Sequence, residues 1–273
     1  MVTSGQRAQR RSKKIGSGIE FADHRDYTPG DDPRYLDWKL YGRTERLLLR
    51  QYEEEEDLSV YFLLDRSASM GMAPAGELNL FERALQVTAA LSYISLSNLD
   101  RVAVVPFSET VERPDRSVRG KGQFFRILRL LSHLQIGGMT HLSDALRDFA
   151  RHRPRRGLAV VISDFYDPAG LDEGLRYLAF RGFEIMVLQL CDGRLLEAEH
   201  WGDLSLVDCE TGERRELCLT PDLMVAYREA FEAFSTGISN SAREVGARHI
   251  RVDVSLPFDE MVMKVFRSGG FLG

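Results

Sequence analysis

Five short apolar segments recur along this chain, and each is bounded by residues that favour turns or helix caps. They are LSVYFLLD (58–65), RVAVVPF (101–107), LAVVISD (158–164), FEIMVLQL (183–190) and RHIRVDV (248–254). Continuous runs of Val, Ile and Leu are typical of strands covered on both faces, because a strand with one solvated face alternates apolar and polar residues. We therefore expect a mainly parallel sheet buried between other elements.

Helical patterns lie between these strands. Leucine, alanine and other apolar residues step by three and four in the segments Leu80–Ile94, Phe125–Leu134 and Leu142–Phe149. The residues predicted to face the core are Leu80, Ala84, Val87, Leu91 and Ile94 in the first, Phe125, Leu128, Leu131 and Leu134 in the second, and Leu142, Ala145, Leu146 and Phe149 in the third. Alternating strands and helices predict an α/β fold with three layers, Rossmann-like, with helices on both faces of the sheet.

Three regions are predicted along the chain. Residues 1–15 contain RAQRRSKK, with five cations in eight residues, and are expected to form a flexible basic arm. Residues 16–57 are rich in turn formers and aromatic residues, Trp38 among them as a buried anchor, and are expected to pack as an N-terminal extension on the main domain. Residues 58–273 form that domain, with an inserted hairpin at 204–219 around Thr211 and Gly212.

Composition excludes several classes of protein. The 273 residues carry 36 Lys and Arg against 41 Asp and Glu, a net charge of -5, so a general nucleic-acid-binding surface is not predicted. Three cysteines without CxxC spacing argue against both a disulfide framework and a zinc site. No apolar run reaches the 18 or so residues of a membrane span, so we expect a cytoplasmic protein, with peripheral membrane association left open.

Oxygen-bearing side chains follow three of the predicted elements. Asp65 ends the first strand, Ser67 and Ser69 lie in the loop after it, Asp164 ends the strand LAVVIS, and Thr140 stands at the start of the Leu142 helix. Ligands of open α/β sheets bind beyond the carboxyl ends of the strands, so these side chains are expected at one edge. Carboxylate and hydroxyl oxygens are the ligands that Mg²⁺, Mn²⁺ or Ca²⁺ prefer, and the five residues are candidate ligands of such an ion.

Each of these residues also has a structural alternative. Thr140 could cap the helix that follows it, the two serines could satisfy loop amides, and Asp164 could cap a helix near Pro168. A Mg²⁺-dependent phosphohydrolase of the haloacid-dehalogenase type is an alternative function. Such enzymes place a second acid two residues after the nucleophile, where this chain has Ser67, and no phosphate-binding GxxxxGK[ST] loop is present.

The segments DRSASM, GGMTHL and ISDF together resemble the metal-ion-dependent adhesion site of von Willebrand factor type A (vWA) domains. The stretch from Gly18 to Asp57 resembles the segment preceding such a domain in bacterial domain-of-unknown-function family 58. The resemblance implies a vWA-like domain whose cation, held by Asp65, Ser67, Ser69, Thr140 and, through water, Asp164, grips an acidic residue of a protein partner. It implies a non-enzymatic interaction module that works with a MoxR-type AAA ATPase. Many family members carry membrane spans ahead of this segment.

Overall fold

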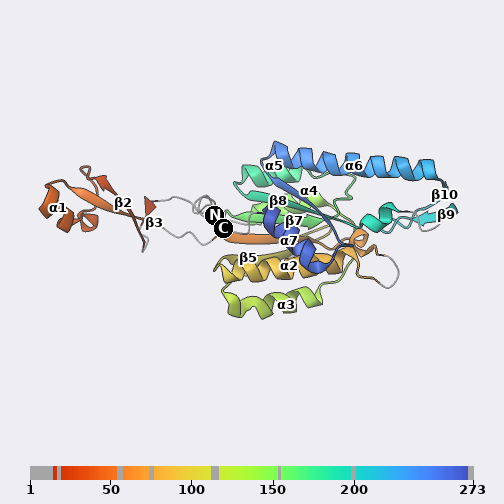
Figure 1. Ribbon diagram of the computed structural model, residues 1–273, viewed down its shortest axis with the longest axis horizontal. Helices are drawn as coiled ribbons and strands as arrows, with labels where there is room; N and C mark the ends of the chain where they lie inside the picture. Colours follow the sequence, from red (N-terminus) through yellow and green to blue (C-terminus); the bar gives the residue numbers. More distant parts are fainter. Residues whose placement is uncertain are drawn as a thin grey trace. The chain divides into compact units, whose positions relative to one another are not determined.

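The computed structural model describes residues 15–16, 20–53, 58–73, 77–111, 117–152, 155–197 and 201–269 (Figure 1). The chain divides into two compact units, residues 1–57 with Gly273 and residues 58–272. The predicted basic arm lies outside the described residues except for Ile15. Packing of the 16–57 extension on the main domain stays a prediction.

The first unit is a small antiparallel sheet with one short helix. Its elements are β1 (Ile15–Gly16), β2 (Glu20–Asp26), α1 (Trp38–Thr44) and β3 (Leu48–Glu53), with strand order β1-β3-β2. Asp37 accepts from the backbone N–H of Lys39 and Leu40 at the start of α1 and pairs with Arg50 at 2.9 Å. Leu36 and Leu49 are buried, but Trp38 is 62% exposed. The expectation that Trp38 is a buried anchor was therefore wrong.

The second unit contains a sheet of six strands with the order β11-β8-β7-β4-β5-β6. These strands are β4 (Ser59–Asp65), β5 (Arg101–Phe107), β6 (Val118–Arg119), β7 (Leu158–Ser163), β8 (Glu184–Cys191) and β11 (Arg248–Asp253). All neighbouring pairs are parallel except β5 with the two-residue edge strand β6. The five longer strands are the five apolar segments of the sequence.

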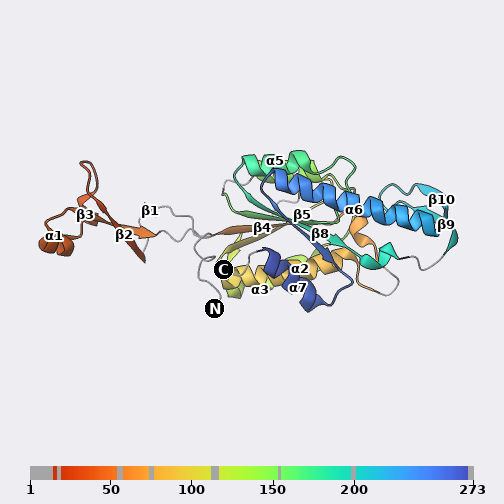
Figure 2. The same cartoon turned by 45° about the horizontal axis from the view of Figure 1, so that its top comes forward.

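Helices cover both faces of this sheet, as Figures 1 and 2 show from two directions. One face carries α2 (Leu80–Ser97), α3 (Phe124–His133) and α7 (Phe258–Gly269), and the other carries α4 (Leu142–His152), α5 (Asp172–Phe180) and α6 (Pro221–Glu244). A hydrophobic core lies on each face of the sheet, and alternate residues of β4 pack into one or the other. Phe62 packs with the first group of helices, and Tyr61 and Leu63 pack with the second. This arrangement confirms the predicted three-layer, Rossmann-like α/β fold. Among the described helices, none is long and apolar enough to cross a membrane.

Helix α3 differs from its prediction in the face that it buries. Phe125 was expected in the core but is 77% exposed, whereas Ile127 and Leu131 are buried. Phe124 and Ile127 take the core positions that were predicted for Phe125 and Leu128, so the apolar stripe is shifted by one residue in the first part of the helix. The predicted Leu131 and Leu134 are correct, since both pack in this core. The other two predicted helix faces are correct: Ala84, Val87 and Leu91 are buried in α2, and all four predicted core residues of α4 are buried.

The predicted hairpin is present as β9 (Gly202–Val207) and β10 (Arg214–Leu219). It lies between β8 and α6, at the end of the unit toward which the parallel strands run (Figures 1 and 2). In the described residues its two strands pair only with each other and form a separate sheet. Gly212 in its turn has φ of 73°, a left-handed conformation that glycine adopts without steric cost.

Candidate functional site

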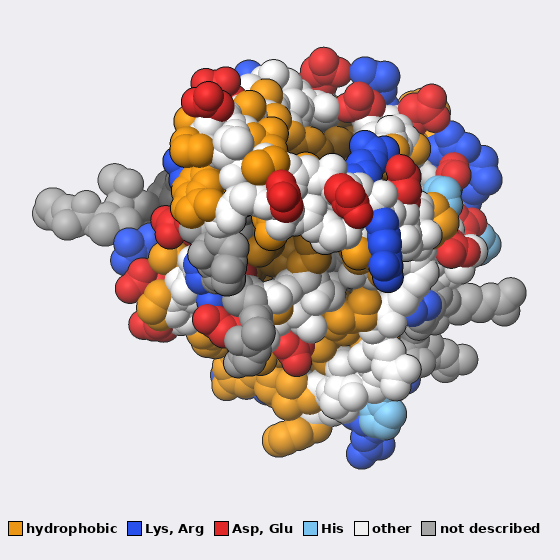
Figure 3. Space-filling model, turned by 90° about the vertical axis from the view of Figure 1, so that its right-hand side faces the viewer, with side chains coloured by type: hydrophobic (Ala, Val, Ile, Leu, Met, Phe, Trp, Pro, Cys, Tyr) orange, Lys and Arg blue, Asp and Glu red, His pale blue; other side chains and the backbone are white. Residues whose placement is uncertain are grey.

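The five predicted ligand residues lie at the carboxyl ends of the parallel strands of the six-stranded sheet. Strand β4 ends at Asp65, and its neighbour β7 ends one residue before Asp164. The chain leaves β4 toward β5 on one side and returns to β7 on the other, which makes this the switch point of the sheet. The side chains are each at most 4% exposed: Asp65, Ser67, Ser69, Thr140 and Asp164. Figure 3 looks onto this end of the molecule, whose surface is hollowed, with acidic, basic and hydrophobic side chains around the hollow.

Asp65 is held by hydrogen bonds to both of its carboxylate oxygens. The backbone N–H of Ser67 donates to Oδ1 at 2.9 Å, and the hydroxyl of Ser163 donates to Oδ2 at 2.6 Å. Ser163 is the last residue of β7 and was not among the predicted site residues. In the sequence, Ser163 could have been suspected as a site residue because it directly precedes Asp164. Its contact with Asp65, however, depends on the pairing of two strands, and the two residues are 98 positions apart.

The loop after β4 is tied to the segment that precedes α4. The backbone N–H of Ala68 donates to the carbonyl of Gly138 at 3.0 Å, and that of Gly137 donates to the carbonyl of Arg66 at 2.8 Å. Within the first loop the hydroxyls of Ser67 and Ser69 are 3.0 Å apart and hydrogen-bonded. These contacts bring the loop of the two serines beside the segment that carries Thr140.

Asp164 has one carboxylate oxygen with a donor and one without. Its Oδ1 accepts from the backbone N–H of Tyr166 at 3.1 Å, while Oδ2 is buried and has no hydrogen-bond partner among the described residues. The hydroxyl of Ser69 interacts with the same carboxyl group and acts to lower its pKa. Burial, followed by the negative charge of Asp65, raises the pKa of Asp164 to about 7. Burial likewise raises the pKa of Asp65. Among the described residues, no Lys or Arg is one of the main groups that shift the pKa of either carboxyl group, so no nearby positive charge compensates the pair there.

The backbone is strained directly after Asp164. Phe165 is buried and has φ of 65°, the left-handed region that bulky residues rarely adopt. This conformation lets the backbone N–H of Phe165 donate to the hydroxyl of Ser163 at 2.8 Å. Strain of this kind costs about 1–3 kcal/mol and is typical of functional sites.

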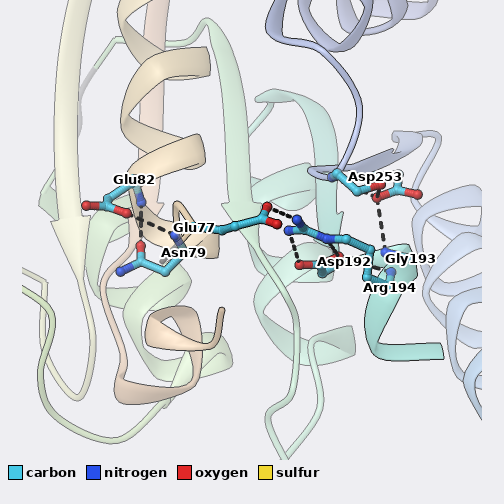
Figure 4. Close-up of polar contacts among 8 residues, drawn as sticks. Glu77, Asn79, Glu82, Asp192, Gly193, Arg194 and Asp253 are labelled. Atoms are coloured by element: carbon cyan, nitrogen blue, oxygen red, sulfur yellow. Dashed lines mark hydrogen bonds and ion pairs between the residues drawn. The ribbon is translucent and has the colours of Figure 1, made fainter. Parts of the chain in front are cut away.

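Asp192 and Asp253, the acidic residues at the carboxyl ends of the strands β8 and β11, have hydrogen-bond or ion-pair partners within the protein (Figure 4). Asp192, which follows β8, pairs with Arg194 at 2.7 Å, and the same guanidinium contacts Glu77. Asp253, the last residue of β11, accepts from the backbone N–H of Gly193 at 3.0 Å and from the hydroxyl of Ser255 at 2.7 Å. Thus the edge satisfies Asp192 and Asp253 with protein groups and leaves Asp164 Oδ2 unsatisfied.

Thr140 contacts a residue that the sequence did not suggest. Its hydroxyl donates to Oε1 of Glu210 at 2.9 Å, and its backbone N–H lies 3.5 Å from Oε2. Glu210 lies in the turn between β9 and β10. The alternative that Thr140 caps α4 is wrong, because α4 begins at Leu142 and, among the described residues, no helical N–H donates to the Thr140 hydroxyl. Asp167 Oδ2 instead accepts from the first helical N–H, that of Leu142, at 2.6 Å. The alternative that Asp164 caps a helix near Pro168 also fails, since its carboxylate binds the N–H of Tyr166.

The described residues contain no cluster of three or more His, Cys, Asp or Glu side chains with the arrangement of a metal centre. The predicted set has a different composition, with two carboxylates and three hydroxyls. It consists of hard oxygen donors only, which fits Mg²⁺, Mn²⁺ or Ca²⁺ and not a soft metal. The unpaired, buried Oδ2 of Asp164 is the feature of this structure that a cation would satisfy.

Several known proteins are similar to this chain. "Uncharacterized protein Rv1480" of Mycobacterium tuberculosis (strain ATCC 25618 / H37Rv) is 30% identical over 237 residues, which cover 85% of this chain and 74% of the relative. "Uncharacterized protein YeaD" of Bacillus subtilis (strain 168) is 31% identical over 77 residues, 28% of this chain and 17% of that protein. The crystal structure of conserved hypothetical protein BatB from Bacteroides thetaiotaomicron has a TM-score of 0.50 at 16% identity, covering 78% of this chain and 98% of that one, and supports the fold alone.

The family described as "Protein of unknown function DUF58" matches residues 23–238, a range that covers part of each unit and all the predicted site residues. This agrees with the resemblance of residues 18–57 to family 58. The chain therefore belongs to the DUF58 family.

Proposed function

We propose that Asp65, Ser67, Ser69, Thr140 and, through water, Asp164 hold a divalent cation, Mg²⁺ or alternatively Mn²⁺ or Ca²⁺, as in a vWA-type adhesion site. The cation would bind an acidic side chain of a partner protein, so the chain would be a metal-dependent interaction module without enzymatic activity. The observation that carries the proposal is the buried Oδ2 of Asp164, which has no hydrogen-bond partner among the described residues and belongs to a carboxyl group close to that of the buried Asp65.

The donor set suits this role. Three of the five side chains are neutral hydroxyls, which bring oxygen atoms to the cation without adding negative charge. A dication held in this way keeps affinity for another carboxylate. The protein supplies orientation, because Asp65 is fixed by Ser67 and Ser163 and the serine loop is anchored to Gly138.

The partner that we propose, from the resemblance to family 58, is a MoxR-type AAA ATPase in the cytoplasm. The haloacid-dehalogenase alternative receives no support from the site. Ser67 stands where that chemistry needs an acid, and its hydroxyl is engaged with Ser69. Turnover of a phosphoester by the isolated protein, dependent on Mg²⁺, would contradict the non-enzymatic proposal.

Thermal unfolding with and without each cation tests the metal site. A ligand that binds only the native state at 100 times its Kd stabilises by about 2.7 kcal/mol, so Mg²⁺, Mn²⁺ or Ca²⁺ should raise the Tm of the wild type by several degrees. The rise should vanish in Asp65→Ala and in Asp164→Asn. Asp253→Asn is the matched control, because Asp253 is an aspartate of the same sheet edge whose carboxylate is satisfied by Gly193 and Ser255. Equal shifts in all four proteins would contradict the site.

Binding of the partner is tested by pull-down of a MoxR-type ATPase. The wild type and Asp253→Asn should retain the ATPase in Mg²⁺ and release it in EDTA, and Asp164→Asn should not retain it in either. Retention by Asp164→Asn at the wild-type level would show that the contact does not pass through the cation.

A further inference from the structure

The tip of the β9–β10 hairpin reaches the candidate cation site of its own chain. Glu210 binds Thr140 through both carboxylate oxygens, one at 2.9 Å from the hydroxyl and one at 3.5 Å from the backbone N–H. The hydroxyl in this contact belongs to one of the five proposed ligands. The charge of Glu210 also acts on the carboxyl groups of Asp65 and Asp164.

The turn holds Glu210 in a defined position. Asp208 Oδ1 accepts from the backbone N–H of Glu210 at 2.9 Å and from that of Thr211 at 2.7 Å. The N–H of Gly212 donates to the carbonyl of Asp208 at 2.9 Å and closes the turn. These bonds order the backbone on both sides of Glu210, so its side chain is presented to Thr140 by a structured turn.

Among the described residues, the β9–β10 hairpin has few other interactions that would fix its position. Its strands pair only with each other in the described residues, and most of their side chains are exposed, Leu206 and Val207 among them. A two-stranded hairpin by itself is only marginally stable in water. The contact of Glu210 with Thr140 therefore joins a weakly supported element to a rigid, buried site.

We propose that Glu210 is an internal ligand of the cation site, whose carboxylate occupies the position that an acidic residue of the partner would take. The inference rests on the proposed function. It has a consequence for binding, because a partner must displace the hairpin tip before its own carboxylate reaches the cation. The free chain would then bind a cation more tightly, and a partner more weakly, than a chain without this carboxylate.

Mn²⁺ binding to the isolated protein, followed by electron paramagnetic resonance of the free ion, tests the proposal without any partner. Loss of one carboxylate ligand in Glu210→Gln should weaken Mn²⁺ binding about tenfold, which corresponds to about 1.4 kcal/mol. Added acetate, a small carboxylate, should strengthen Mn²⁺ binding by Glu210→Gln and leave the wild type unchanged. Glu213→Gln is the matched control, since Glu213 follows the same turn and its carboxylate contacts Arg215 instead.

The outcomes separate the two proposals. Wild-type Mn²⁺ affinity in Glu210→Gln, or a higher one, overturns the internal ligand while leaving the cation site intact. An equal effect of acetate on the wild type and on Glu210→Gln also overturns the internal ligand alone. Absence of Mn²⁺ binding by the wild type itself overturns the cation site and the internal ligand together. Circular dichroism of each variant confirms that it is folded.

Discussion

The hydroxyl of Ser163 donates a hydrogen bond of 2.6 Å to Oδ2 of Asp65, and this bond joins the ends of two parallel strands. Together with the N–H of Ser67 on Oδ1, it gives the Asp65 carboxylate a single orientation. In Asp164, the next residue after Ser163, Oδ2 has no hydrogen-bond donor among the described residues. The two carboxyl groups of the site thus differ: one is fully oriented by the protein, and the other has an oxygen that is free to bind a ligand.

Ser163→Ala should destabilise the protein, because it removes the donor to Oδ2 of Asp65 and the acceptor for the N–H of Phe165. Leaving buried polar groups without partners costs about 1–3 kcal/mol each, and urea unfolding measures the loss. Ser92→Ala is the control, since Ser92 is also fully buried but its hydroxyl has no partner in the described residues. We expect little loss there, and equal losses in both variants would refute the role given to Ser163.

Without divalent cations, stability should fall as the pH rises from about 4 to about 7. An unfolded aspartate has a pKa of about 3.9, whereas burial raises the pKa of Asp164 to about 7. Between these values the folded state binds more protons than the unfolded state, so the free energy of unfolding decreases with pH by an amount on the order of a few kcal/mol. Burial raises the pKa of Asp65 and acts in the same direction.

Urea unfolding in EDTA across this pH range measures the effect. Asp164→Asn cannot lose a proton, so its stability should change less with pH than that of the wild type. Saturating Mg²⁺ should stabilise the wild type most at the high end of the range, where the carboxylates are ionised. An unchanged slope in Asp164→Asn would mean that other groups dominate the pH dependence.

Gly138→Ala should weaken both the fold and cation binding. Gly138 has φ of 88°, and an added Cβ would lie 3.0 Å from the hydroxyl of Ser108, while its carbonyl anchors Ala68 between the two serines. A strained conformation of this kind costs about 1–3 kcal/mol. Gly137→Ala is the adjacent control, because a Cβ there meets nothing within 4 Å. Urea unfolding and Mn²⁺ affinity should both change in the first variant and stay near wild type in the second.

Arg194→Ala should lower the free energy of unfolding while leaving cation binding unchanged. The substitution removes the partner of Glu77 and of the buried Asp192 (Figure 4). An unpaired buried charge costs about 1–3 kcal/mol or more, measured by urea unfolding. Arg215→Ala removes an arginine that is paired with Glu213 on the exposed hairpin, and a surface pair of this kind contributes little. Loss of Mn²⁺ binding in Arg194→Ala would contradict this prediction and would mean that the Asp192–Arg194 pair and the cation site are coupled.

The chain's pattern of apolar residues determined the layers of the fold. Strand β4 is apolar at every position from Val60 to Leu64, so it had to be covered on both faces, and α4 has the spacing of a one-sided helix. The same reasoning failed for α3, whose sequence has apolar residues at both Phe124 and Phe125. Spacing alone does not determine which of two adjacent faces of the helix is buried. Packing against α2 and β5 placed Phe124, and not Phe125, against the core.

The sequence by itself determined the local part of the candidate site, because Asp65, Ser67 and Ser69 lie within five residues of one another, and the strand ends predicted that Thr140 and Asp164 would join them. Only the tertiary structure decided that Ser163 orients Asp65 and that Glu210 binds Thr140, contacts that join residues 98 and 70 positions apart. The physical reason is that a hydrogen bond between distant segments depends on strand order and on where a hairpin folds back. Local propensity and hydrophobic period contain no information about either.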